Sequence, residues 1–129
     1  MNDQLNFYEN KLKYEMDPSD LNAALNNKEN LVVVDARKAE AWQKEHIPGA
    51  INLPHAQMNA ETTKDWDRSK LYVTYCDGIG CNASTKGALN LTKLGFKVKE
   101  LMGGLEWWKL DGYAVNGKDA DGNQIGCSC

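Results

Sequence analysis

Apolar and polar positions along the chain form short blocks that predict strands separated by helices. Residues 31–35 and 71–75 are runs dominated by β-branched, aromatic and other apolar side chains, which is typical of strands covered on both faces. Residues 97–101 alternate between polar and apolar side chains, and residues 50–53 form a shorter extended segment. The sequence therefore predicts four extended segments distributed along the chain.

Helix signals lie between these extended segments. Asp17-Pro18-Ser19-Asp20 combines an aspartate cap, a first-turn proline and an acid near the positive helix end, so a helix begins at Pro18. The predicted helices cover about 3–15, 18–27, 38–44, 83–94 and 105–110, with a short helix or loop at 61–67. This order predicts an α/β fold, with a mostly parallel central sheet and helices on both of its faces.

The chain of 129 residues has the length of one domain. We expect this domain to cover residues 1–115 and to include the N-terminal helix, in which Leu5, Tyr8 and Leu12 share a face. Residues 116–129 are rich in Gly, Asn and Asp and end in Cys127-Ser128-Cys129, so they are predicted to form a flexible tail.

Composition and charge limit the kinds of function that we expect of this protein. The net charge of −3 argues against a general nucleic-acid or anionic membrane surface. No segment approaches the roughly 20 apolar residues of a membrane span, and the first residues lack the regions of a secretory signal. We expect a cytoplasmic protein with no nucleic-acid or membrane partner. In a reducing cytoplasm, its four cysteines are candidates for catalytic, redox or metal-binding groups.

The segment after the strand at 71–75 carries the candidate chemistry. Cys76 lies where that strand ends, the position at which ligands gather in open α/β sheets. Gly78 and Gly80 let the backbone curl so that its N–H groups point inward, and the next helix adds the positive end of its dipole. Such an anion cradle lowers the pKa of a thiol. The local pattern fits equally well a small buried hydrophobic cysteine. The predicted anion-binding loop comprises Asp77, Gly78, Ile79, Gly80, Cys81 and Asn82, and Asn82 is expected to cap the following helix.

Three further segments carry a family resemblance. They are Val34-Asp35-Ala36-Arg37, the stretch His46-Ile47-Pro48-Gly49-Ala50-Ile51-Asn52-Leu53-Pro54, and Gly103-Gly104 followed by Trp108 and Gly112. On these residues the chain resembles the rhodanese-like family, of the single-domain sulfurtransferase type, over nearly its whole length. The resemblance implies a sulfurtransferase that carries sulfane sulfur as a persulfide on Cys76 and passes it to a nucleophile. It implies no cofactor, and as partners a small sulfur donor or thiol acceptor, or a sulfur-carrier protein.

The loop departs from the usual family pattern. Typical members have a loop of six residues that runs from the cysteine to an arginine, whereas here Cys81 stands five residues beyond Cys76 and the loop contains no arginine. The form Cys-x-Gly-x-Gly-Cys-Asn resembles a subgroup of the family. Arginine binds oxyanions in a bidentate way, so its absence weakens the expectation that thiosulfate is the donor. It also weakens the phosphatase and arsenate-reductase functions of the wider fold.

Several residues have both structural and functional interpretations. Asp35 and Arg37 are predicted to support the strand end rather than to take part in catalysis. Cys81, Cys127 and Cys129 are candidate resolving thiols, with an incidental role as the alternative for each. A zinc site is disfavoured because Cys76 and Cys81 have poor spacing for a zinc knuckle, so no metal is expected.

Two other functions stay open at this point. One is a non-catalytic or regulatory module that binds a partner protein through the same loop. The other is a thiol-redox protein that uses Cys76 and Cys81. An intact cysteine in a glycine-rich loop favours the enzyme.

Overall fold

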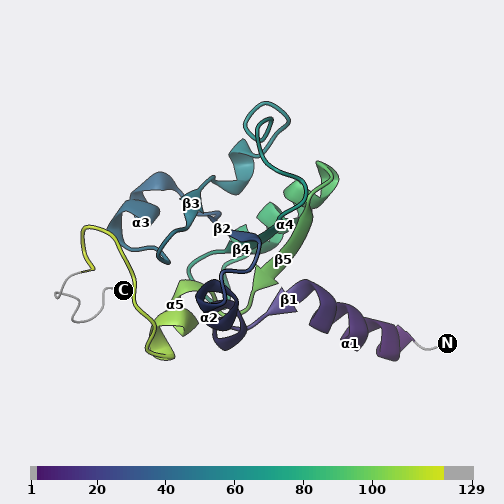
Figure 1. The fold of residues 1–129 in the computed structure, drawn as a ribbon, viewed down its shortest axis with the longest axis horizontal. Coiled ribbons are helices and arrows are strands. Elements are labelled where there is room, and N and C mark those ends of the chain that lie inside the picture. The colour runs from purple at the N-terminus through teal and green to yellow at the C-terminus, as the bar shows by residue number, and fades with distance from the viewer. Residues whose placement is uncertain (1–2, 121–129) are drawn as a thin grey trace.

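The computed structural model describes residues 3–120, which form a parallel sheet with helices on both faces (Figure 1). The five strands lie in the order β1-β5-β4-β2-β3, and every neighbouring pair is parallel. They are β1 (Glu15–Met16), β2 (Leu31–Asp35), β3 (Ile51–Asn52), β4 (Leu71–Tyr75) and β5 (Lys97–Leu101). The predicted α/β class is confirmed, and β4 occupies the centre of the sheet.

The helices agree with the predicted segments. They are α1 (Asp3–Tyr14), α2 (Pro18–Asn26), α3 (Ala39–Lys44), α4 (Ala83–Lys93) and α5 (Gly104–Leu110), with a 3-10 turn η1 (His55–Gln57), while residues 60–65 form turns. The Asp17 carboxylate accepts the Asp20 N–H at 2.8 Å, which confirms the cap of α2. Asn82 is the N-cap residue of α4 as predicted, but its side chain makes no capping bond. The backbone of a capping residue is usually extended, whereas that of Asn82 is not (φ −104°, ψ 15°).

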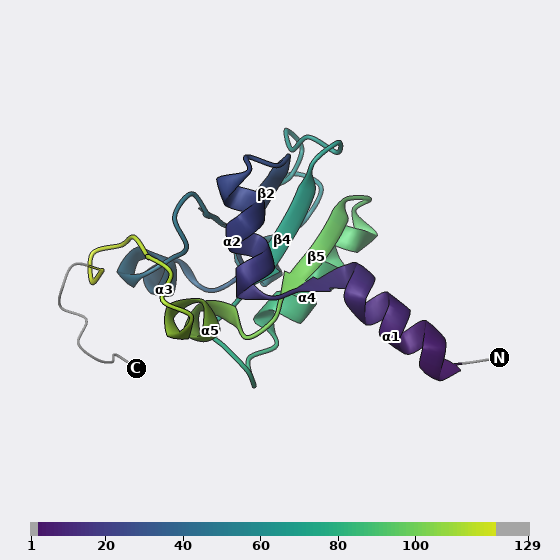
Figure 2. The same ribbon diagram turned by 60° about the horizontal axis from the view of Figure 1, so that its bottom comes forward.

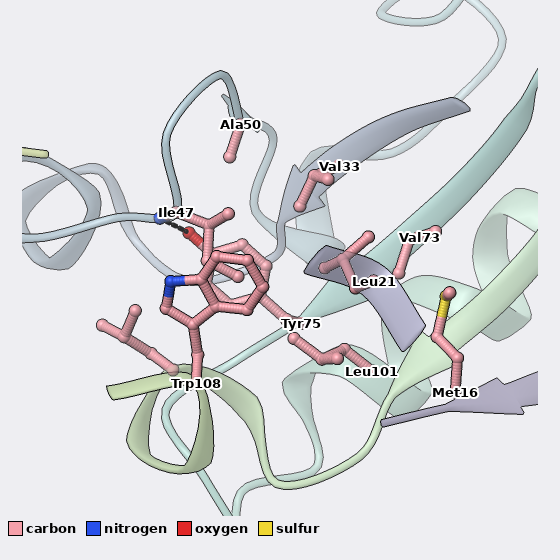
Figure 3. Packing of buried hydrophobic residues seen from close by; sticks show 10 residues of the cluster. Met16, Leu21, Val33, Ile47, Ala50, Val73, Tyr75, Leu101 and Trp108 are labelled. Atoms are coloured by element: carbon pink, nitrogen blue, oxygen red, sulfur yellow. Dashed lines mark hydrogen bonds between the residues drawn. The ribbon is translucent and has the colours of Figure 1, made fainter. Parts of the chain in front are cut away.

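Successive side chains of the central strands point to opposite faces of the sheet, so each face has a hydrophobic core. Val33 and Val73 face α2 and α5, where they pack with Leu21 and Trp108 (Figure 3). The dashed line in Figure 3 joins Ile47 and the Tyr75 hydroxyl, which accepts the Ile47 N–H at 3.1 Å. On the opposite face, the core consists of Val34, Ala36, Met58, Tyr72, Leu91 and Phe96, beneath α4 and η1. The two cores explain why β2 and β4 are apolar on both sides.

The N-terminal helix α1 is present as predicted but projects from the body of the domain (Figures 1 and 2). None of its residues is buried, and Leu5, Tyr8 and Leu12 are exposed. Helix α1 leads directly into β1, which pairs with β5 and was not predicted. A strand of two residues is too short to produce a periodic pattern.

The chain after α5 returns to α3. Asn116 and His46 form an antiparallel bridge, and the N–H groups of Lys118 and Asp119 donate to the carbonyls of Gln43 and Lys44, each at 2.9 Å. The first residues of the predicted tail at 116–129 are therefore attached to the domain. Cys127 and Cys129 lie outside the described residues. Within residues 3–120, the helices are too short or too polar to cross a membrane.

Candidate active site

Cys76 directly follows the central strand β4 and opens the loop that leads to α4. Its side chain lies at the base of a pocket of about 250 Å³, and the residue is only 2% exposed. The loop residues Gly78, Ile79, Gly80 and Cys81 form one wall of this pocket. As predicted, Cys76 lies at the carboxyl end of a parallel strand, the position at which ligands gather in open α/β sheets.

The start of α5 holds the loop from one side. The Leu105 N–H donates to the Cys76 carbonyl at 2.9 Å, and the Glu106 N–H donates to the Asp77 carbonyl at 2.8 Å. This close approach depends on Gly104, which has a φ of +59° and whose position leaves no room for a Cβ against the Cys76 carbonyl. The Gly103-Gly104 pair therefore brings α5 onto the active loop.

A buried ion pair holds the loop from the other side. The Arg37 guanidinium donates to the fully buried Asp35 carboxylate through Nε at 2.9 Å and Nη2 at 2.7 Å. Its Nη1 reaches the Asp77 carboxylate at 2.9 Å, and the Tyr75 hydroxyl donates to Asp35 at 2.7 Å. Burial raises the pKa of Tyr75, so its hydroxyl remains a donor. This network fixes the end of β2 to the first residue after Cys76, which supports the structural interpretation of Asp35 and Arg37.

The surroundings of the sulfur favour the neutral thiol. The Cys76 S–H donates to the Cys81 carbonyl at 3.0 Å and lies 3.5 Å from the Ser84 hydroxyl. Burial raises the pKa of the Cys76 thiol, and the Cys81 side chain raises it further, whereas the hydroxyl and N–H of Ser84 oppose this rise. The sequence predicted a lowered pKa. That direction is wrong because desolvation and Cys81 together outweigh the hydroxyl and N–H of Ser84.

Two glutamates also line the pocket. Glu15 of β1 and Glu100 of β5 are register partners on neighbouring strands. The hydroxyls of Ser84 and Thr85 donate to Oε2 of Glu100 at 2.7 and 2.6 Å. Glu15 pairs with Lys11 of α1 at 2.8 Å. Across residues 3–120, the lining of this pocket includes no lysine, arginine or histidine.

Comparison with known proteins identifies the family. The family model of the Rhodanese-like domain matches residues 17–111. The chain belongs to the rhodanese-like family. The crystal structure of the BH2092 protein from Bacillus halodurans is similar to this one, with a TM-score of 0.85 and 43% sequence identity, over 90% of this chain and 85% of that one. The rhodanese-like assignment thus rests on sequence and on structure.

Curated relatives have different overall organisations. Thiosulfate sulfurtransferase GlpE of Coxiella burnetii is 36% identical over 84 residues, which cover 64% of this chain and 75% of GlpE. The HTH-type transcriptional regulator Rv0324 of Mycobacterium tuberculosis is 37% identical over 89 residues, which cover 67% of this chain but only 38% of Rv0324. Segments similar to this chain therefore occur both in a protein named as a sulfurtransferase and in a longer protein named as a transcriptional regulator.

Only some of the predicted site residues of this rhodanese-like domain line the pocket together with Cys76. Gly78, Ile79, Gly80 and Cys81 line the pocket with Cys76, whereas the Asp77 side chain turns to Arg37 and is 71% exposed. Asn82 is not part of the lining. Among residues 3–120, no three His, Cys, Asp or Glu side chains gather as a metal site would require.

Sequence reasoning missed four polar residues that line the pocket: Glu15, Ser84, Thr85 and Glu100. Glu100 carried a usable signal, because it is a charged residue near the carboxyl end of an inner strand, at the edge where Cys76 lies. Glu15 had none, since it becomes a neighbour of Glu100 only through the two-residue strand β1.

Proposed function

We propose that this protein is a sulfurtransferase that carries sulfane sulfur as a persulfide on Cys76. The observation that carries the proposal is a buried cysteine sulfur at the base of a pocket, at the carboxyl end of the central strand. The sulfurtransferase name of the similar GlpE supports it. We place this chemistry in the cytoplasm, where reductants keep cysteines as thiols.

The reaction has two half-reactions that balance without an oxidant. In the first, the Cys76 thiolate attacks the sulfane sulfur of a small persulfide or polysulfide, and the donor leaves as a thiolate or a shortened polysulfide. In the second, an acceptor thiolate attacks the outer sulfur of the Cys76 persulfide, and the electron pair of the broken S–S bond returns to Cys76. Because the resting group is a neutral thiol, the first half-reaction requires loss of its proton.

The side chains that line the pocket are poorly suited to thiosulfate as a donor. Thiosulfate is a dianion, and within the described chain the pocket lining presents Glu15 and Glu100 and no cationic side chain. Repulsion opposes the entry of any anionic donor, inorganic polysulfide included. Thiosulfate also has sulfonate oxygens to be held, and the described lining offers no arginine for them. We propose that the loop of the form Cys-x-Gly-x-Gly-Cys-Asn, with Cys81 in place of the usual arginine, serves persulfide or polysulfide donors, or a sulfur-carrier protein.

The test is the mass of the protein after exposure to each donor. Reduced protein is incubated with thiosulfate or with inorganic polysulfide, desalted and weighed, and the adduct is located by peptide mapping under non-reducing conditions. Polysulfide should add about 32 Da to Cys76 and thiosulfate much less. Cys76→Ser should abolish the adduct, whereas the matched variant Cys81→Ser should keep it. If neither donor adds sulfur, the proposal is wrong and a partner-binding module becomes the better interpretation.

A second candidate function is thiol–disulfide chemistry between Cys76 and Cys81. It is favoured by the proximity of the two residues, because the Cys76 sulfur lies 3.0 Å from the Cys81 carbonyl and both cysteines line the pocket. Hydrogen peroxide would take two electrons from the two thiols, forming one disulfide and water. A peptide linked through Cys76 and Cys81 after mild peroxide treatment supports this function. Two freely alkylated thiols would contradict it.

A further inference from the structure

We infer that the pocket above Cys76 selects small thiols that carry a positive charge, such as aminothiols, as sulfur acceptors over anionic thiols. This inference rests on the proposed function, because it names the acceptor class of that same site. Its basis is the pair of carboxylates, Glu15 and Glu100, that share the pocket with the sulfur of Cys76.

The position of the two carboxylates is fixed by the sheet. Glu15 and Glu100 stand at the same register on the parallel neighbours β1 and β5, and both line the pocket. Like charges at adjacent strand positions repel each other and cost stability. Ser84 and Thr85 orient Glu100 by donating to the same oxygen, Oε2, at 2.7 and 2.6 Å. A bound cation would relieve this repulsion.

Positively charged side chains near Glu15 and Glu100 neutralise their negative charge only in part. Lys11 of α1 pairs with Glu15 at 2.8 Å, and its ammonium group is also attracted by Glu100. Within residues 3–120, no lysine, arginine or histidine lies within ion-pair distance of Glu100. Arg37 is occupied by Asp35 and Asp77 on the other side of the loop. The two glutamates and one lysine therefore leave a net negative charge.

The base of the pocket has the opposite character. The N–H of Ser84, in the first turn of α4, favours a negative charge at the Cys76 sulfur, although burial opposes it. An acceptor with a thiolate at one end and an ammonium group two carbons away would place its thiolate at the base and its ammonium group toward Glu100. An acceptor with a carboxylate in place of the ammonium group would meet repulsion instead.

The acceptor reaction forms one S–S bond and breaks another. The acceptor thiolate attacks the outer sulfur of the Cys76 persulfide, the Cys76–sulfur bond breaks, and Cys76 leaves as a thiolate. The product is the acceptor persulfide. No external oxidant or reductant enters the step.

The experiment compares three thiols of similar size and different charge. The 129-residue protein is loaded with inorganic polysulfide and desalted. The loss of the added sulfur is then followed by mass for cysteamine, 2-mercaptoethanol and 3-mercaptopropionate. The measured quantity is the ratio of the cysteamine rate to the 3-mercaptopropionate rate. Dividing the ratio of each variant by that of the wild type cancels the intrinsic reactivity of each thiol and any shared change at Cys76.

Two variants remove one carboxylate each, and a third is a matched control. Glu100→Gln and Glu15→Gln should each lower the ratio by about threefold to tenfold, since one partly exposed charge changes each rate by roughly twofold to threefold in opposite directions. Glu29→Gln makes the same change of net charge at an exposed position that does not line the pocket, and it should leave the ratio unchanged. High salt should also reduce the wild-type preference.

The outcomes separate the inference from the function on which it rests. If no donor loads Cys76, the proposed function fails. If Cys76 loads and both glutamate variants keep the wild-type ratio, the acceptor inference is wrong and the sulfurtransferase proposal stands. An equal fall in Glu29→Gln would also overturn the inference, because it would show an effect of overall charge.

Discussion

Replacing Arg37 by methionine should destabilise the domain strongly, because it leaves the Asp35 carboxylate buried without its cation. Asp35 has no exposed surface, and it receives two Arg37 nitrogens at 2.9 and 2.7 Å. Removal of one partner from a buried ion pair costs about 3–5 kcal/mol. The Tyr75 hydroxyl would remain as a donor to Asp35 at 2.7 Å and would compensate in part.

The remaining contacts of Arg37 contribute less to the free energy of unfolding. Its bond to Asp77, whose side chain is 71% exposed, is worth at most about 1 kcal/mol. We therefore expect a total loss of about 3–5 kcal/mol, against the 5–15 kcal/mol of a typical domain. At about 4 °C per kcal/mol, the midpoint of thermal unfolding should fall by about 12–20 °C.

The assay is urea and thermal unfolding followed by circular dichroism. Asp35→Asn combined with Arg37→Met removes the buried charge, so the double variant should lose less stability than the sum of the two single variants. Glu61→Gln breaks the exposed pair with Lys64 and should change stability by less than about 1 kcal/mol. A stable Arg37→Met protein that no longer accepts sulfur would refute the structural interpretation and give Arg37 a direct role in the chemistry.

Two other predictions concern the active loop. Gly104→Ala should slow sulfur loading of Cys76 at least about tenfold, because its Cβ would overlap the Cys76 carbonyl. The control Gly49→Ala also changes a glycine of positive φ, but its Cβ would enter open space, so this variant should load normally. Equal loading rates of the two variants, measured by mass spectrometry, would contradict the prediction. Because the pKa of the Cys76 thiol is raised, its thiolate fraction increases with pH, so its alkylation by iodoacetamide should accelerate up to and beyond about pH 9. A plateau below about pH 8, measured on the Cys76 peptide, would indicate a lowered pKa instead.

The main elements of this fold could be predicted from the sequence because burial leaves a local pattern. Strands β2 and β4 are covered on both faces, so nearly every residue in them is apolar. The start of α2 was predictable from Asp17, whose side chain makes its bond three residues away. Strand β1 was not, because its two residues are defined by their pairing with β5.

Periodicity does not reveal what a helix face contacts. The spacing of Leu5, Tyr8 and Leu12 predicted α1 correctly, yet the structure leaves all three exposed. Asn82 shows a related limit. Its residue type suits a helix cap, but the backbone of the loop decides whether the side chain reaches the helix.

In the candidate site, too, the features that leave a local pattern in the sequence were predictable and the others were not. Cys76 was predictable because a strand end and a glycine-rich loop are contiguous in the sequence. Its pKa was not, since the predicted direction ignored a burial that depends on distant segments. Glu15, Ser84 and Glu100 meet at the pocket only through strand register and the packing of α4. The charge of the pocket is therefore a property of the tertiary structure.

The most direct test of the central proposal follows one sulfur atom through Cys76. The protein is loaded with polysulfide that carries a heavy sulfur isotope, freed of donor and mixed with cysteamine, and both the Cys76 peptide and the small-molecule persulfide are trapped and weighed. We predict that the label appears first on Cys76 and then, as it leaves Cys76, in the acceptor, and that Cys76→Ser abolishes both signals. Label that never appears on Cys76, or that reaches the acceptor equally fast with Cys76→Ser, would contradict the proposal.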